Sequence, residues 1–270
     1  MRGDVRLELI PIAGFEEQVA QLPPHAVVPV TCSPTVGIEA TLRSSAYLLE
    51  AGHRPVPHIA ARMVAGPGHL REIIRQLNDL DLREIFVVGG DIKDRVGPWE
   101  GGGELLEELA TFEHHIERIG VPSYPETHPL IERGALTAIL KAKQPHAAHT
   151  VSQICFDPDT ILAWIADIRS QGVTLPVYVG IPGPMEVRKL LATSLRIGVG
   201  ASARFLSKQR GLAAKLLSRY RPDDLVNRLA PYMDDPDYGI AGFHVNTFNQ
   251  VKATTEWLEA MNRPDLKAAT

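Results

Sequence analysis

Short apolar runs recur along the chain, and they alternate with longer stretches in which apolar residues return every three or four positions. Runs of four or five apolar residues are typical of buried strands, and the longer periodic stretches are typical of amphipathic helices. This alternation predicts parallel strands that are joined by crossover helices. The predicted strands are Arg6–Ile10, Ala26–Val30, Val56–Ile59, Glu84–Val88, Ile119–Pro122, Val151–Cys155, Pro176–Gly180 and Gly242–Asn246.

The stretches between these strands and after the last one predict the helices Glu39–Ala51, Gly68–Leu77, Glu104–His114, Ile131–Lys143, Pro158–Ser170, Pro184–Ala192 and Val251–Met261. Between Leu195 and Gly239 the sequence becomes helix-rich and predicts extra helices at Ser202–Lys208, Gly211–Ser218 and Pro222–Tyr232. Eight strand–helix units predict an α/β fold, a (β/α)8 TIM barrel with extra helices before the last strand. A doubly wound open sheet is the alternative, because the pattern alone does not prove closure.

Length and composition agree with one large globular domain. The chain has 270 residues, of which 44% are hydrophobic and 22% charged. That composition is ordinary for a globular protein, and α/β barrels of this length fold as one domain. Because no low-complexity linker interrupts the pattern, we expect a single barrel domain over residues 1–270.

Charge and cysteine content narrow the class of partner. The formal net charge is −4, whereas binding to nucleic acid irrespective of sequence needs a basic face. No stretch approaches the roughly 18 apolar residues of a membrane span, and the first residues lack a signal-peptide pattern. The two cysteines and ten histidines show no metal-ligand spacing. We therefore expect a cytoplasmic protein that takes small molecules, with no nucleic acid, membrane or metal partner, and we infer no protein partner.

In a barrel, the carboxyl ends of the strands converge on one mouth, where the chemistry is found. Polar side chains and bare glycine backbone stand at most of these predicted strand ends, so the mouth is expected to be a site. They are Glu8, Thr31, His58, Gly89-Gly90-Asp91, Tyr124 to His128, Gln153, Gly180 to Gly183, and Asn246-Thr247.

Nine short motifs at these positions carry a resemblance. In chain order they are LELIP, VTCS, PHIAAR, VVGGD, YPETHP, LKAK, SQICFD, GIPGPM and GFHVNTFN. Together, at barrel spacing, they are similar to the methylenetetrahydrofolate reductase family. The resemblance implies a (β/α)8 barrel that reduces 5,10-methylenetetrahydrofolate to 5-methyltetrahydrofolate, and it implies a folate-type substrate.

The chemistry of that reduction requires an acid, because one carbon–nitrogen bond must open to an iminium ion before a hydride can add. Glu8 lies on an otherwise apolar strand, so burial is expected to raise the pKa of its carboxyl and suit it to general acid catalysis. The resemblance implies the same role for Glu8. The alternative is a carboxylate that only binds backbone or a lysine at the rim.

Two further residues are expected at the substrate. An ionised carboxylate stabilises a nearby iminium, and Asp91 is the candidate for this catalytic role. The resemblance implies that Asp91 also binds the pterin ring and that Gln153 contacts the folate. The alternatives are an Asp that caps a helix or turn and a solvated strand-end amide.

The remaining candidates belong to the cofactor side. Thr31, His58, Tyr124 and His128 match family positions that contact flavin or nicotinamide, and Lys143 is the one lysine of its helix favoured to meet a phosphate. A lone histidine on an apolar strand is otherwise a core residue, and a lysine near a helix end is otherwise solvated.

The hydride donor is expected to be NADH or NADPH, and a flavin is doubtful. Flavin-bearing members of the resembled family end strand four in Arg-Gly-Asp, whereas this chain has Gly89-Gly90-Asp91. They also carry polar FAD partners on the helix after strand five, where this chain has Leu136, Ile139 and Ala142. We therefore expect direct hydride transfer from nicotinamide to folate. The alternatives are transfer through FAD by a ping-pong mechanism, or a barrel that binds folate without reducing it.

Overall fold

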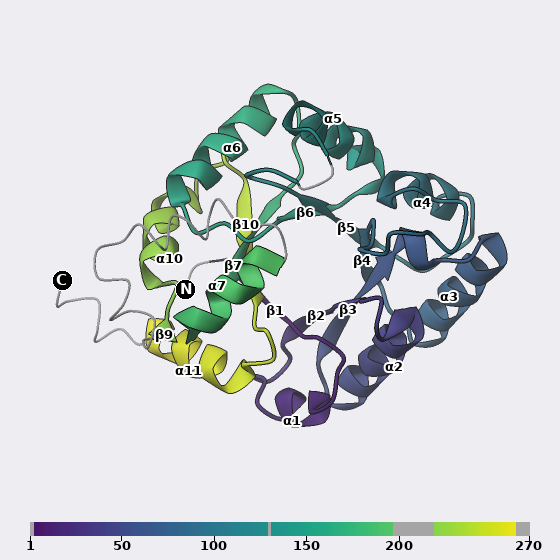
Figure 1. Ribbon diagram of the computed structural model, residues 1–270, viewed down its shortest axis with the longest axis horizontal. Coiled ribbons are helices and arrows are strands. Elements are labelled where there is room, and N and C mark those ends of the chain that lie inside the picture. The colour runs from purple at the N-terminus through teal and green to yellow at the C-terminus, as the bar shows by residue number, and fades with distance from the viewer. Residues whose placement is uncertain (1–2, 129–130, 197–218, 263–270) are drawn as a thin grey trace.

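The computed structural model describes residues 3–128, 131–196 and 219–262. Eight parallel strands close into a barrel in the order β1-β10-β7-β6-β5-β4-β3-β2, which confirms the predicted TIM barrel (Figure 1). Its strands are β1 (Asp4–Glu8), β2 (Val27–Val30), β3 (Arg54–Ala60), β4 (Glu84–Val88), β5 (Arg118–Ser123), β6 (His149–Ser152), β7 (Val177–Pro182) and β10 (Ile240–Asn246).

Helices surround this barrel on the outside (Figure 1). They are α1 (Phe15–Val19), α2 (Gly37–Glu50), α3 (Pro67–Asp79), α4 (Gly102–Leu109), α5 (Arg133–Lys143), α6 (Pro158–Ser170), α7 (Val187–Arg196), α10 (Asp223–Leu229) and α11 (Val251–Asn262), with short 3-10 turns at Ala61–Met63, Gln144–His146 and Ala230–Tyr232. Their apolar faces and the outward-facing strand residues form the main hydrophobic core.

The connection before the last strand differs from the prediction in its details. Met185–Glu186 (β8) and Arg219–Tyr220 (β9) pair as a small antiparallel sheet, which the sequence pattern did not predict. Helix α7 therefore begins at Val187, after β8, and not at Pro184. The predicted helix Pro222–Tyr232 is α10 followed by a 3-10 turn, and the predicted helices Ser202–Lys208 and Gly211–Ser218 lie outside the described residues.

Several predicted element ends were wrong by a few residues, and at two of them a side chain binds the backbone. The helix predicted to reach His114 ends at Leu109, and Asn78 accepts a hydrogen bond from the backbone N–H of His115. The strand predicted to reach Cys155 ends at Ser152, because the Gln153 side chain accepts from the Ile154 N–H at 2.8 Å. Helix α1 was not predicted.

Alternation along the strands decides what fills the barrel. On β1, Leu7 packs among the helices, whereas Arg6 and Glu8 join side chains of other strands across the interior. An apolar cluster shares this interior, made of Val27, Val56, Phe86, Val151 and Tyr178. Gly120 has to lack a side chain, because a Cβ there would lie 2.5 Å from His149 Nε2. The barrel is thus filled with packed side chains, several of them charged or polar.

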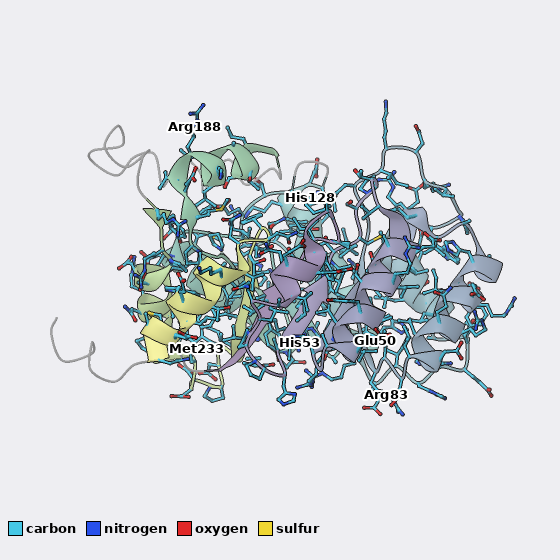
Figure 2. The ribbon with its side chains drawn as sticks, turned by 90° about the horizontal axis from the view of Figure 1, so that it is seen from below. Glu50, His53, Arg83, His128, Arg188 and Met233 are labelled. Atoms are coloured by element: carbon cyan, nitrogen blue, oxygen red, sulfur yellow. The ribbon has the colours of Figure 1, made fainter. Side chains whose placement is uncertain are left out.

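The two ends of the barrel are separated in the side view (Figure 2). His128 and Arg188, the latter on α7, lie at the end where the strands finish, and Glu50, His53 and Arg83 lie at the opposite end, where strands begin. All sequence-predicted site residues except Lys143 belong to the carboxyl-terminal part of a strand or to the segment that follows it. Lys143 is the last residue of α5.

Candidate functional site

Glu8 is held inside the barrel near its mouth by side chains from two other strands. His244 Nε2, on β10, lies 3.0 Å from Glu8 Oε2, within hydrogen-bond distance. His58 Nε2, on β3, lies 4.0 Å from the same oxygen. The Glu8 side chain is 16% exposed, and those of His244 and His58 are 4% and 8% exposed. Glu8, His58 and His244 are called the mouth cluster below.

The pKa of Glu8 contradicts the sequence-based expectation. Burial raises this pKa, but the hydrogen bond with His244 and the charges of His244 and His58 outweigh burial, so that the pKa lies below its ordinary value. Burial lowers the pKa of His58 to about 4, against the opposing charge of Glu8. Near pH 7, His58 is therefore neutral and Glu8 is a carboxylate in this state.

The strand end that carries Glu8 is fixed to the loop after β10. The Thr247 hydroxyl donates to the Glu8 carbonyl oxygen at 2.6 Å. Asn249 also holds this strand end, since its side-chain oxygen accepts from the Ile10 N–H and its side-chain nitrogen donates to the Ile10 carbonyl, both at 2.9 Å. Asn249 has a φ of +55°, which asparagine tolerates better than most residues. Glu8 is thus held through both side chain and backbone.

Asp91 stands exposed at the mouth, directly after Gly89 and Gly90. Gly90 has a φ of +96°, and a Cβ there would lie 3.1 Å from the Ala60 Cβ, so this turn requires glycine. The charge of Asp91 acts on Tyr124 and His128, which places the three groups on one side of the mouth.

Tyr124 and His128 pack edge to face, with ring centroids 4.7 Å apart. Burial, together with the charge of Asp91, raises the pKa of Tyr124 to about 12, so this hydroxyl stays protonated. Burial lowers the pKa of His128, and the charge of Lys143 lowers it further. Lys143 is itself half-buried, its pKa is lowered by burial, and it forms no ion pair within the described parts of the chain.

The two remaining candidates lie at the ends of β2 and β6. The Thr31 hydroxyl oxygen is buried and has no hydrogen-bond partner among the described residues. Gln153 uses its side-chain oxygen to accept from the Ile154 N–H, which leaves its amide nitrogen as the group that can bind a ligand.

Comparison with known proteins places the chain in a family. The sequence model of the methylenetetrahydrofolate reductase family matches residues 35–210, more than half of the chain. The chain belongs to the methylenetetrahydrofolate reductase family. Methylenetetrahydrofolate reductase 2 of Saccharomyces cerevisiae is 26% identical over 182 residues, which are 61% of this chain but only 29% of the yeast protein. The chain therefore matches about three tenths of that relative's length.

A solved structure supports the fold over nearly the whole chain. It is described as an uncharacterized protein from Clostridium thermocellum that binds two copies of 5-methyl-5,6,7,8-tetrahydrofolic acid. The TM-score is 0.70 at 12% identity, with 99% of this chain and 96% of that chain covered. At this identity the likeness shows a shared barrel.

Two sets of polar residues at the barrel axis were not assigned a role from the sequence. One is His244 of the mouth cluster. It pairs with Arg6 two positions before the pair of Glu8 with Asn246, and since side chains alternate along a strand, it faces the interior as Arg6 and Glu8 do. The other lies one layer below, where Arg6 contacts Glu84 at 2.5 Å and His149 at 3.2 Å and stacks on the Tyr178 ring. The residues of this second set are called the lower layer.

Neither set resembles a metal centre. Among the described residues, no group of three or more His, Cys, Asp or Glu side chains is arranged to hold a metal ion. Within the same residues, no helix combines the length and the apolar character that crossing a membrane requires.

Proposed function

We propose that this member of the methylenetetrahydrofolate reductase family reduces 5,10-methylenetetrahydrofolate to 5-methyltetrahydrofolate, with NADH or NADPH as the hydride donor. The observation that carries the proposal is the enclosed Glu8 carboxyl group, held at the barrel mouth by His244. The family match supports the reaction, and the folate bound by the Clostridium thermocellum protein supports the substrate class.

Glu8 supplies the proton in this proposal. A folate that covers the mouth removes water from Glu8, and burial is already the largest influence on this carboxyl. Its pKa therefore rises when substrate binds, and the group takes up a proton. Glu8 then protonates the leaving nitrogen of the methylene bridge, so that the carbon–nitrogen bond opens to an iminium ion.

Asp91 and Gln153 hold the substrate. The exposed Asp91 carboxylate accepts hydrogen bonds from the pterin ring and stabilises the positive charge of the iminium. The Gln153 amide nitrogen donates to the folate, because its oxygen is already used.

The nicotinamide side of the mouth is formed by Thr31, His58, Tyr124 and His128, and the charge of Lys143, at the end of α5, acts on His128. The Thr31 hydroxyl, which has no partner among the described residues, is a donor for a ligand, and the half-buried Lys143 ammonium group, which forms no ion pair with those residues, would gain from a phosphate. A hollow of about 210 Å³ opens beside Tyr124, lined by Arg133, Leu136 and Trp164 among others. Glu126 and Asp167 also line this hollow, so its lining is mixed, with one cation and two carboxylates.

The residues present do not fit a tightly held FAD, which the family normally uses. Leu136, Ile139 and Lys143 follow one another at helical spacing on α5, and only Lys143 is polar. Strand β4 is followed by Gly89-Gly90, which carries no cationic side chain. Charge-assisted hydrogen bonds are each worth roughly 1.5–3 kcal/mol, so a pyrophosphate without several of them binds weakly. We therefore propose direct hydride transfer from nicotinamide to the iminium carbon.

Steady-state kinetics test the proposal. We expect consumption of NADH or NADPH that depends on methylenetetrahydrofolate, intersecting lines of a ternary complex, a colourless protein and no stimulation by added FAD. A yellow protein with parallel lines would identify the flavin-dependent reaction. Folate binding without nicotinamide consumption would identify a binding protein or a non-reductive enzyme.

A further inference from the structure

We propose that His244 is a positioning residue for the proton donor: its Nε2–H holds Glu8 by one carboxylate oxygen, turns the other toward the substrate, and stabilises the carboxylate that remains when the proton leaves. This inference rests on the proposed function for its meaning in catalysis. Its structural part, the hold of His244 on Glu8, is tested separately below.

The geometry around Glu8 separates its two oxygens. His244 Nε2 is hydrogen-bonded to Glu8 Oε2 at 3.0 Å. His58 Nε2 lies 4.0 Å from the same oxygen. Oε1 is therefore the oxygen that can carry the reactive proton to a substrate. Because His244 Nε2 occupies Oε2, the carboxyl group has one favoured orientation in the site.

The direction of the hydrogen bond follows from the other nitrogen of His244. Nδ1 is buried and has no hydrogen-bond partner in the described part of the chain. A buried N–H without a partner is costly, so the hydrogen of the contact with Glu8 belongs on Nε2. His244 then donates to Glu8 Oε2.

Three rings pack around His244 and hold its side chain in position beside Glu8. His58 from β3 and Phe86 from β4 lie near its ring, with centroids 6.5 and 6.4 Å away. His149 from β6 lies below, and burial together with the charge of Arg6 holds its pKa far below the ordinary value, at about 2. Both neighbouring histidines are thus neutral near pH 7, and Glu8 is the carboxylate with which His244 shares a hydrogen bond.

This hydrogen bond favours the reaction step itself. The proton passes from Glu8 Oε1 to the leaving nitrogen, the electron pair of the breaking carbon–nitrogen bond goes to that nitrogen, and the remaining nitrogen and carbon become the iminium. Glu8 acquires a full negative charge in this step. A hydrogen bond to a charged oxygen is stronger than one to a neutral oxygen, so the interaction with His244 grows as the proton leaves.

Two variants of His244 separate the hydrogen bond from the volume of the side chain. His244→Gln places an amide N–H near the position of Nε2, whereas His244→Asn has the same amide one methylene short of Glu8. The matched control is His149→Asn, which makes the same change at a buried histidine in the lower layer. Thermal melts establish that each variant is folded before it is compared.

The first measurement is the titration of the Glu8 carboxyl by 13C NMR of glutamate-labelled protein, assigned with Glu8→Gln. Loss of the hydrogen bond removes a stabiliser of the charged form, so His244→Asn should raise the pKa of Glu8 by roughly one unit or more. We expect His244→Gln and His149→Asn to titrate close to the parent. An unshifted Glu8 in His244→Asn, or an equal shift in His149→Asn, would overturn the proposal.

The second measurement is the pH dependence of kcat. The acid must be protonated, so kcat falls as pH rises through the pKa of Glu8 in the substrate complex. His244→Asn should lower kcat about 10- to 100-fold and move this fall to higher pH, with KM for the nicotinamide unchanged. His244→Gln should recover much of kcat. An unchanged kcat in His244→Asn would overturn the positioning role.

The two measurements also separate this inference from the proposed function. If the parent protein consumes no nicotinamide with methylenetetrahydrofolate, the proposed function fails, and the titration of Glu8 still decides whether His244 holds it.

Discussion

Two polar layers share the inside of one barrel, and they are built in opposite ways. In the lower layer, Arg6 lies between the carboxylate of Glu84, the ring of Tyr178 and the edge of His149, and its side chain is 3% exposed. In the mouth cluster, the Glu8 carboxyl has one hydrogen bond, with His244, and no arginine or lysine of the described residues is in contact with it. Both layers hold buried nitrogens without a partner among those residues, Nε2 of His58 and Nδ1 of His244 at the mouth and Nε of Arg6 and Nδ1 of His149 below.

The difference concerns what each layer can do. A buried arginine that is paired with a carboxylate and stacked on a ring is held for structure, and removal of its partner costs stability. A buried carboxyl held by one hydrogen bond to His244 stays in place but can still gain or lose a proton. We infer that the lower layer fixes the strand positions and that the mouth cluster uses this rigidity for chemistry.

The largest effect on turnover is expected when the mouth cluster is changed at Glu8. Glu8→Gln keeps the shape of the side chain and an oxygen that accepts from His244, but it carries no transferable proton. We expect kcat to fall about 10²- to 10⁴-fold while the melting temperature changes little. Turnover within a few-fold of the parent would remove Glu8 from the acid role.

The lower layer should respond in the opposite way. Glu84→Gln leaves the buried Arg6 guanidinium without its closest carboxylate, which should cost about 3–5 kcal/mol of the free energy of unfolding. Turnover per folded molecule should not change, as urea denaturation and active-site titration can show. The control is Glu72→Gln, in an exposed pair with Arg75 on α3, for which we expect little change in stability. A large loss of kcat in Glu84→Gln would contradict the division between the layers.

Acid sensitivity should be common to both layers. The pKa of His58 is lowered to about 4 and that of His149 to about 2 by burial, below the ordinary value of 6.5. The unfolded chain then binds more protons than the folded chain below pH 6.5, so stability is full above that pH and falls as the pH drops toward 4.

The loss attributed to His58 is roughly 3 kcal/mol at most. Denaturation at several pH values should show a smaller slope in His58→Phe and in His149→Phe than in the parent. A parent protein equally stable at pH 7 and pH 4.5 would contradict the neutral state of both rings.

The smallest expected effect belongs to the exposed rim of the mouth. Asp91→Asn removes a charge that water already screens in part, so we expect kcat/KM for the folate to fall roughly 10-fold, through both kcat and KM. Initial rates at varied folate and varied nicotinamide separate the two substrates. An effect confined to the KM of the nicotinamide would place Asp91 on the other side of the mouth.

Much of this fold could be read from the sequence because local patterns decide it. Alternation on β1 places Arg6 and Glu8 inside and Leu7 outside, and the strand ends place Asp91 and Tyr124 at the mouth. The end of β6 could not be read, because the Gln153 side chain replaces the next hydrogen bond of the strand. The pairing of β8 with β9 joins segments more than 30 residues apart, which no local pattern encodes.

The sign of the Glu8 pKa shift was missed for a related reason. Burial of Glu8 follows from its own apolar strand, and burial alone raises a carboxyl pKa. The opposing partners come from β3 and β10, and only the register that sets Glu8 beside Asn246 brings His244 within reach. A lone histidine on an apolar strand looks like a core residue until that register is known.

The most direct test of the account is the fate of the hydrogen that the nicotinamide gives up. NADH deuterated at the transferred C4 position should yield 5-methyltetrahydrofolate with one deuterium in its methyl group when the reaction runs in ordinary water, because the mouth passes hydride straight to the iminium carbon. A route through a bound flavin lets that hydrogen exchange with water, so product without label would contradict direct transfer. Absence of methylated product with either nicotinamide would contradict the proposed reaction itself.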